Sequence, residues 1–184
     1  MRQRHRGPIV LLTTLGALFI TTALLLYARS TRDRPPTTAN RAVVSIGSKT
    51  FQLEIAADPT AQDRGLGGRD HIDNDGGMIF VFPEPQWHEF VMRDCAVPID
   101  LLYLDHAGRI IALYAMLPDP PRTAEEPADG AMGDFAYASR LKTYPSGGPA
   151  QFAIELKGNS IAALNLREGD LVRLDTAALE KLVR

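Results

Sequence analysis

Short hydrophobic runs, rich in branched and aromatic side chains, recur along the chain from residue 43 onward. In the first clear case Phe51, Leu53 and Ile55 alternate with polar residues, which is the period of a half-buried strand. Residues 43–46 precede this run across a turn that begins at Gly47. The two runs therefore predict an opening β-hairpin.

Further runs of the same kind predict more strands, because each is short and bounded by Gly, Pro or Asp. They cover residues 78–82, 87–92, 101–104, 109–116, 151–156 and 171–174. Helical signals are brief: a cap at Asp58-Pro59 that leads to Gly67-Gly68, one turn at 160–164, and a terminal helix within 176–184. This pattern predicts a mainly β domain, a compact antiparallel β-sandwich or barrel with one or two short helices.

The stretch 117–150 is the exception, because it is rich in Pro, Gly and Ala and has no clear periodicity. A loop of this length inside a compact domain is usually functional or disordered. We therefore treat it as a long loop of the β domain.

The first 41 residues have a different character. Residues 8–27 form an uncharged apolar run long enough to cross a bilayer as a helix. We expect a cytoplasmic N-terminus at 1–7, a transmembrane signal-anchor at 8–28, a Pro-containing linker at 29–41 and an external domain at 42–184. The protein would then be a single-pass protein of the cell membrane. A cleaved signal peptide is the alternative, although no small-x-small cleavage site stands out.

Charge and cysteine content narrow the function classes. Of the 20 Lys and Arg residues six lie in residues 1–34, with only one of the 22 acids, so the remainder has a net charge of −7. Such a balance argues against a nucleic-acid partner. Cys95 is the only cysteine, so an intramolecular disulfide is impossible, and its apolar neighbours favour a small buried side chain.

Two patterns that would indicate metal or cofactor chemistry are incomplete. His88-Glu89 begins like a zinc-binding helix, but Met92 stands at the second histidine position. Residues 71–76 resemble a calcium loop, but the closing glutamate position is Phe82. The sequence also lacks phosphate-loop and dinucleotide fingerprints, so we expect no metal and no cofactor.

A polar cluster at a turn is the remaining candidate site. Arg93, Asp94 and Asp100 lie between the end of one predicted strand and the start of the next. The Arg93 guanidinium could donate two hydrogen bonds to a polar ligand, and the two carboxylates could accept hydrogen bonds from that ligand. The structural alternative is that the carboxylates only bond backbone amides of the turn, with Arg93 paired to one of them.

Several blocks carry a resemblance to a known family: Gly65-Leu66-Gly67-Gly68-Arg69, 77–82, 90–95, Val97-Pro98-Ile99-Asp100, 152–156 and 168–170. In order and spacing they resemble domain of unknown function 192 over about residues 43 to 175. The resemblance implies a small, mostly β, often membrane-anchored bacterial domain without a settled activity. It implies ligand-binding candidates at Arg69, Met92, Arg93, Asp94, Asp100 and Glu155.

The chain departs from that pattern at Gly67 and Val91, where the resemblance implies methionine and tryptophan. A pocket lined by these two positions would be reshaped here.

Three functions remain open at this stage. The first is a membrane-anchored domain that binds a small polar or carbohydrate-like ligand of the cell envelope. The second is a hydrolase whose acid/base pair is Asp94 with Asp100, or Asp100 with Glu155, which requires carboxyls about 5 to 10 Å apart. The third is a non-catalytic envelope scaffold that binds another protein.

Overall fold

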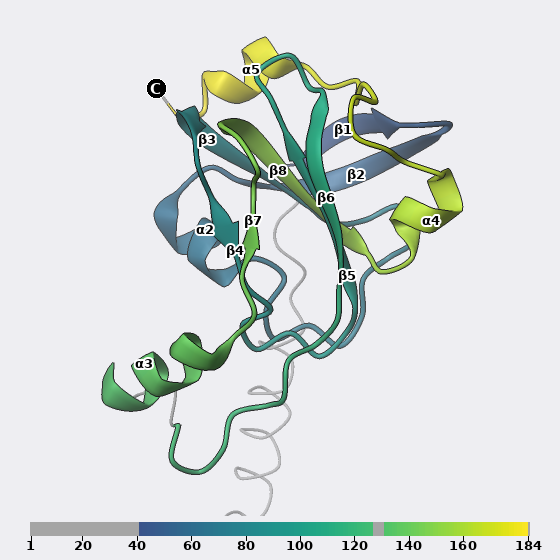
Figure 1. Ribbon diagram of the computed structural model, residues 1–184. Coiled ribbons are helices and arrows are strands. Elements are labelled where there is room, and N and C mark those ends of the chain that lie inside the picture. The colour runs from purple at the N-terminus through teal and green to yellow at the C-terminus, as the bar shows by residue number, and fades with distance from the viewer. Residues whose placement is uncertain (1–40, 127–130, 184) are drawn as a thin grey trace, which may run out of the picture. The chain divides into compact units, whose positions relative to one another are not determined.

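The computed structural model of the protein describes residues 41–126 and 131–183 (Figure 1). The apolar run 8–27 and most of the linker lie outside the described residues, so the membrane anchor stays a prediction. Among the helices that are described, none is long and apolar enough to span a bilayer.

The described residues form a mainly β domain built on one mixed sheet of six strands, ordered β1-β2-β3-β8-β5-β6. A second, two-stranded sheet pairs β4 with β7. The strands are β1 (Arg41–Ile46), β2 (Lys49–Ala56), β3 (Met78–Gln86), β4 (Glu89–Phe90), β5 (Ile99–Leu104), β6 (Ile110–Met116), β7 (Tyr144–Pro145) and β8 (Ala150–Lys157).

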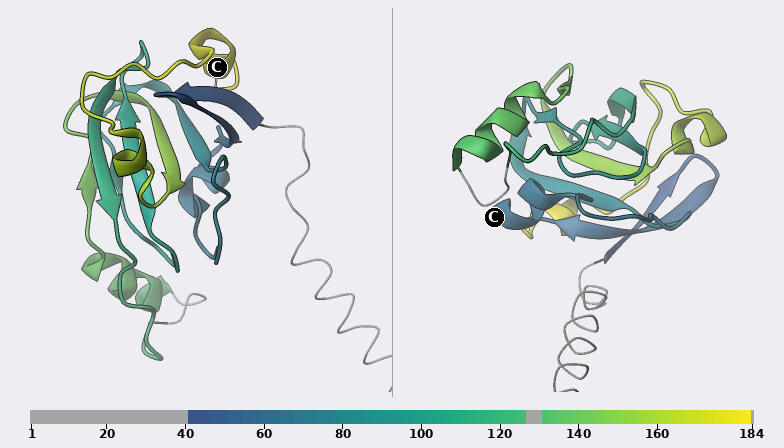
Figure 2. Two further views of the ribbon diagram at one scale, coloured as in Figure 1. Left: turned by 90° about the vertical axis from the view of Figure 1, so that its right-hand side faces the viewer. Right: turned by 90° about the horizontal axis from the view of Figure 1, so that it is seen from below.

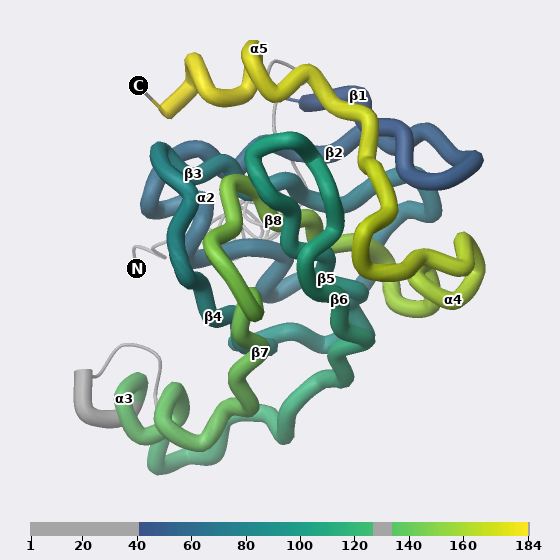
Figure 3. The backbone as a smooth tube through the Cα atoms, turned by 45° about the horizontal axis from the view of Figure 1, so that its top comes forward, coloured from purple at the N-terminus to yellow at the C-terminus, as the bar shows by residue number. Residues whose placement is uncertain are grey.

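The fold differs from the predicted antiparallel sandwich or barrel in two ways. First, β3 runs parallel to β2, because the crossover of residues 57–77 returns the chain to the same end of the sheet. Second, the strongly curved sheet does not close (Figure 2). The segment 169–173 runs between its edges (Figure 3), but it makes only the isolated bridges Ser45–Arg173 and Arg109–Leu171. The run at 171–174 is thus not a regular strand.

Both faces of the sheet are buried. Side chains along each central strand point alternately to one face and to the other. On β8, Phe152 and Ile154 pack into one hydrophobic cluster, whereas Ala153 packs into the cluster on the other face. The first cluster also receives Leu179 of the C-terminal helix. Glu155 follows on the same face as Ala153, and this places a carboxyl in the middle of the sheet.

Four described helices accompany the sheet: α2 (Pro59–Arg64), α3 (Ala131–Arg140), α4 (Ser160–Leu164) and α5 (Thr176–Glu180). The cap at Asp58 is confirmed, since its side chain accepts a hydrogen bond from the Ala61 N–H (3.0 Å), although α2 ends earlier than expected, at Gly65. The turn at α4 and the terminal helix α5 are confirmed as well. The stretch 117–150 contains α3 and β7, which its composition did not indicate.

Candidate functional site

The most unusual polar group of the domain is Glu155, on the central strand β8. It pairs with Met78 of β3 on one side and with Leu101 of β5 on the other, so apolar neighbours flank it in the sheet. Its exposed fraction is only 4 %. A carboxyl at such a position loses most of its hydration, which disfavours the charged form.

The electrostatics of Glu155 follow from this burial. Desolvation raises its pKa from the ordinary value of 4.5 to about 7, while the Leu66 N–H and the nearby Arg69 guanidinium act in the opposite direction. The Leu66 N–H donates to Glu155 Oε2 at 3.2 Å. Among the described residues, no Lys, Arg or His forms an ion pair with Glu155. The carboxyl therefore keeps its proton to a much higher pH than an exposed glutamate does, and it titrates in the neutral range.

Glu155 lines a cavity of about 340 Å³ between α2, β4 and the end of the 117–150 stretch. In Figure 1 the ribbons of α2, β4 and β7 gather on this side of the sheet. The other lining residues are Gln62, Asp63, Arg64, Gly65, Leu66, Gly67, Phe80, Glu89, Phe90, Val91, Arg93, Cys95 and Thr143. We call this space the Glu155 cavity.

The wall beside the carboxyl is a tight turn that requires glycine. Gly65 has a φ of +51°, and a Cβ built on it would lie 3.3 Å from Glu155 Oε2 and 3.4 Å from Phe80 Cζ. The absence of a side chain lets the turn approach Glu155 closely enough for the Leu66 N–H to reach it. Gly67 and Val91, the two departures from the family pattern, line the same cavity.

Two aromatic rings form the apolar part of the cavity. Phe80 and Phe90 meet edge to face with ring centroids 4.8 Å apart, and Phe90 meets Tyr103 in the same way at 5.5 Å. Cys95 also lines the cavity, but burial raises the pKa of its thiol to about 12. The thiol is thus protonated at neutral pH, but the side chain is half-buried and not fully buried as the sequence predicts.

Arg69 is held outside the cavity by an ion pair. Its two terminal nitrogens donate to both carboxylate oxygens of Glu54, each at 2.8 Å. This bidentate hydrogen bonding lowers the pKa of Glu54 and raises that of Arg69. Arg69 therefore acts on Glu155 through its charge and not through a contact.

Arg93 and Asp94 belong to an ion-pair network that ties α3 and the segment 117–126 to the 92–95 turn. Arg93 pairs with Asp134 at 3.0 Å, and Asp94 pairs with Arg122, which also reaches Asp134 at 2.7 Å. Hydrogen bonds from Arg122 to these two carboxylates raise its pKa. Figure 3 shows the segments 117–126 and 134–140 beside the sheet.

Tyr137 lies at the centre of this network. The guanidinium groups of Arg122 and Arg140 lie 4.0 Å and 4.8 Å from its ring centroid, and its hydroxyl accepts a hydrogen bond from the Asp94 N–H at 3.0 Å. Arg140 in turn pairs with Glu126 at 2.7 Å. Arg93 is the one member that also lines the Glu155 cavity.

Asp100 lies elsewhere, at the start of β5, and is only 1 % exposed. Its Oδ2 accepts a hydrogen bond from the Ile161 N–H at 2.6 Å, and the amides of Asn159 and Ser160 also bond the carboxylate. Burial raises the pKa of Asp100, and these three amides oppose the shift. Asp100 thus anchors the first turn of α4, whose own N-cap residue supplies no side-chain hydrogen bond.

The structure therefore brings together only part of the predicted site. Arg93 and Glu155 share the cavity, Met92 is buried in the adjoining core, and Arg69 and Asp94 are engaged in ion pairs. Asp100 is separate and does not line the Glu155 cavity, so neither carboxylate pair considered for a hydrolase shares this space. Sequence reasoning missed Phe80, Phe90 and Glu89 as lining residues, because the pattern of a short strand does not show which cavity its side chains reach.

Comparison with known proteins identifies relatives but no activity. The model of family DUF192, described as "Uncharacterized ACR", matches residues 42–174. A search of curated proteins found no match.

Two solved structures share the fold. One, from Sinorhizobium meliloti 1021, is described as a candidate transcription regulator; it is 21 % identical, with a TM-score of 0.58 over 74 % of this chain and 93 % of that one. The other, a protein of unknown function from Novosphingobium aromaticivorans DSM 12444, is 22 % identical, with a TM-score of 0.59 over 76 % of this chain and 89 % of that one. At these identities the likeness concerns the fold alone.

Proposed function

The chain belongs to the DUF192 family, whose activity is not established. We propose from the site that the Glu155 cavity binds a small hydroxyl-bearing, carbohydrate-like ligand. The observation that carries the proposal is the buried Glu155 carboxyl in the lining of a cavity, without a basic ion-pair partner among the described residues. A buried carboxyl with spare hydrogen-bonding capacity favours a ligand that can donate to it.

The composition of the lining supports a sugar in preference to a purely apolar ligand. Phe80 and Phe90 provide apolar surface, while Gln62, Glu89 and Arg93 provide donors and acceptors around it. A sugar ring presents both kinds of surface, apolar C–H faces and a rim of hydroxyls. A site that combines apolar walls with a few convergent polar groups is typical of small-molecule pockets.

The location of the domain remains part of the same proposal. The apolar run 8–27 and the arginines before it support a membrane anchor with the β domain outside the cytoplasm. A ligand of the cell envelope would then be within reach of the cavity.

Hydrolysis is a second candidate, favoured by one observation. A carboxyl whose pKa is about 7 is suited to proton transfer at neutral pH, and Glu89 supplies another carboxyl to the same cavity. A hydrolase would cleave a bound glycoside, whereas a binding domain would release it unchanged.

We expect the full-length protein in lipid nanodiscs to bind the β-1,4 disaccharide of N-acetylglucosamine, with an affinity that rises between pH 5.5 and 8.5. The rise follows because hydroxyl donors favour the ionised carboxylate, which becomes the major form above the Glu155 pKa of about 7. Saturation-transfer NMR measures both binding and cleavage. Glu155→Gln should weaken binding about tenfold or more, since it removes a hydrogen bond to a charged group.

Glu168→Gln is the control, because Glu168 is exposed and lies outside the cavity lining. It should leave binding and its pH dependence unchanged. If the disaccharide and N-acetylglucosamine itself do not bind, or if Glu155→Gln binds as well as the unmodified protein, the proposal is wrong. Slow release of monosaccharide would establish the hydrolase instead.

A further inference from the structure

We propose a second site, independent of the Glu155 cavity, that binds a single-chain amphiphile: a linear aliphatic chain ending in an anionic group. The anionic group would bind between Lys49 and Lys157, and the chain would lie in the apolar cavity beside α4. The proposal rests on three observations: two lysines that converge without an acidic partner, a large apolar cavity, and the lining residues that the two places share.

The lysines converge on a single residue. Lys49 Nζ donates to the backbone oxygen of Asn74, and Lys157 Nζ donates to Asn74 Oδ1 at 2.8 Å. The ammonium of Lys49 also lies 4.8 Å from the ring centroid of Phe51, which restricts its position. Within the described ranges neither lysine takes part in an ion pair.

The positive charge at Lys49 and Lys157 is unusual for this acidic domain. Outside residues 1–34 the chain has a net charge of −7, so acids are plentiful, yet two like charges meet here on one neutral residue, Asn74. Two ammonium groups that bind two oxygens of the same residue repel each other, and an anion between them relieves this repulsion. Both lysines line a cavity of about 290 Å³ together with Asn74 and Ser160. The chemistry fits a carboxylate or a phosphate monoester.

The neighbouring cavity is larger and mainly apolar. It has a volume of about 530 Å³, within the usual range for small-molecule sites, and its walls come from β5, β6, α4 and the loops beside them. Ile72, Val97, Met116, Leu117 and Ile161 provide its larger apolar side chains. Leu117 is 69 % exposed, so its side chain is accessible to a ligand in this cavity.

The two cavities adjoin, because Lys157, Gly158 and Asn159 line both. In Figure 1 this boundary is the turn between β8 and α4. A ligand that fills both places therefore needs a charged end and an apolar body joined directly to it. This is the structure of an alkyl carboxylate or an alkyl phosphate.

Two acids in the apolar cavity determine which way the ligand lies. Asp100 lines it, but its buried carboxylate is engaged by the amides of residues 159–161. Asp70 also lines it, beside His71. An anionic group would be repelled by Asp70 and attracted by the lysines, so the charged end belongs between Lys49 and Lys157 and the chain points toward Met116 and Leu117.

The test uses the full-length protein in lipid nanodiscs and dodecanoate that carries a photoactivatable diazirine near its methyl end. After irradiation, labelled peptides are located by mass spectrometry, which separates this site from labelling of the apolar run 8–27. We expect labels at residues 116–117 and 161–162. Unlabelled dodecanoate or dodecyl phosphate should suppress them, whereas neutral dodecanol should not. Whichever of the two anions competes better identifies the carboxylate or the phosphate monoester as the preferred head group.

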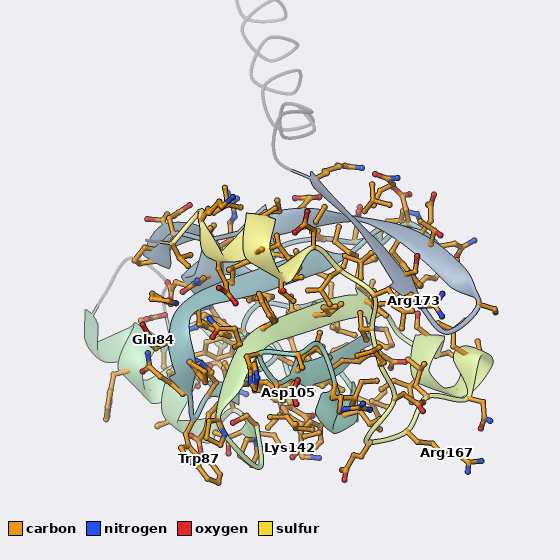
Figure 4. All side chains as sticks on the ribbon, turned by 90° about the horizontal axis from the view of Figure 1, so that it is seen from above. Glu84, Trp87, Asp105, Lys142, Arg167 and Arg173 are labelled. Carbon is orange, nitrogen blue, oxygen red and sulfur yellow. The ribbon has the colours of Figure 1, made fainter. Side chains whose placement is uncertain are left out.

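Lys49→Gln and Lys157→Gln should each lower the labelling about fivefold, as expected for a partly exposed ion pair. Lys142→Gln is the matched control, since Lys142 Nζ also lies 4.8 Å from an aromatic ring centroid, that of Tyr144. Lys142 lines neither of the two cavities, and in Figure 4 its label lies apart from that of Arg167, which follows α4. Equal suppression by dodecanol, unchanged labelling in both lysine variants, or labelling confined to other segments would each overturn the proposal.

Discussion

Replacing Asp100 by alanine is expected to lower the free energy of unfolding by about 3 kcal/mol, although the side chain removed is small. The carboxylate is 1 % exposed and accepts hydrogen bonds from the backbone amides of Ile161, Asn159 and Ser160. Alanine leaves these three backbone donors without the acceptor that the carboxylate provides. A buried donor without a partner costs about 1 to 3 kcal/mol, and more than one is affected here.

The cost has a structural origin that a surface aspartate does not share. Asn159 has a φ of +74°, so the chain enters α4 through a strained residue, and Gly158 donates its N–H to the Pro98 oxygen at 3.0 Å. Asp100 holds this turn against the start of β5. Asp100→Asn should therefore cost only about 1 kcal/mol, because the amide oxygen still accepts from the same backbone groups.

Urea unfolding monitored by circular dichroism measures these differences, with Asp175→Ala as the matched control. Asp175 also caps a helix of five residues, accepting from the Ala178 N–H at 3.0 Å, but it is exposed. Its replacement should cost about 1 kcal/mol. If Asp100→Ala unfolds no more easily than Asp175→Ala, Asp100 does not anchor α4 as described.

Replacing Glu155 by glutamine should have the opposite effect and stabilise the protein at alkaline pH. Below pH 4.5 the Glu155 carboxyl is neutral in both the folded and the unfolded chain, so its titration does not affect stability. Between pH 4.5 and about 7 the unfolded chain releases the proton while the folded chain keeps it, and stability falls. Above pH 7 the full cost of the buried charge is present, about 3 kcal/mol.

Glutamine cannot ionise and still offers an oxygen to the Leu66 N–H. The variant should therefore match the unmodified protein near pH 4 and exceed it at pH 8 by up to about 3 kcal/mol. The informative quantity is the difference between the two proteins at each pH, because other titrating groups cancel in it. Glu168→Gln serves as the control and should show no such difference. Equal stabilities of the Glu155 variant and the parent at pH 8 would show that the carboxyl is not desolvated.

Much of the fold could be predicted from local patterns. The alternation at Phe51 and Leu53, the aromatic run at 78–82 and the cap at Asp58 report on neighbouring residues, and each is confirmed in the structure. The parallel pairing of β2 with β3 was not predicted, because it depends on the path of a crossover and not on either strand. Helix α3 was missed because the hydrogen-bonding partners of its Tyr137 and Arg140, Asp94 and Glu126, lie in other segments.

The candidate site was predicted less well for a similar reason. Arg93, Asp94 and Asp100 are close in sequence, but β5 begins between them and carries Asp100 to the α4 turn, while Asp94 meets Arg122. Glu155 was named through the family resemblance, since a lone glutamate in a hydrophobic strand does not reveal that Met78 and Leu101 will flank it. The proximity of the Gly65 turn to Glu155, and the aromatic wall of Phe80 and Phe90, arise only when distant segments meet.

The titration of the Glu155 carboxyl itself tests the binding site most directly. Carbon-13 labelling of glutamate side chains in the full-length protein, with Glu155→Gln to assign the signal, gives its pKa by NMR without and with the N-acetylglucosamine disaccharide at saturation. We predict a midpoint at about pH 7 in the free protein and a lower midpoint in the complex, because hydroxyl donors stabilise the carboxylate. A midpoint near 4.5, or one that saturating disaccharide does not move, would contradict the assignment of Glu155 as the ligand-binding group.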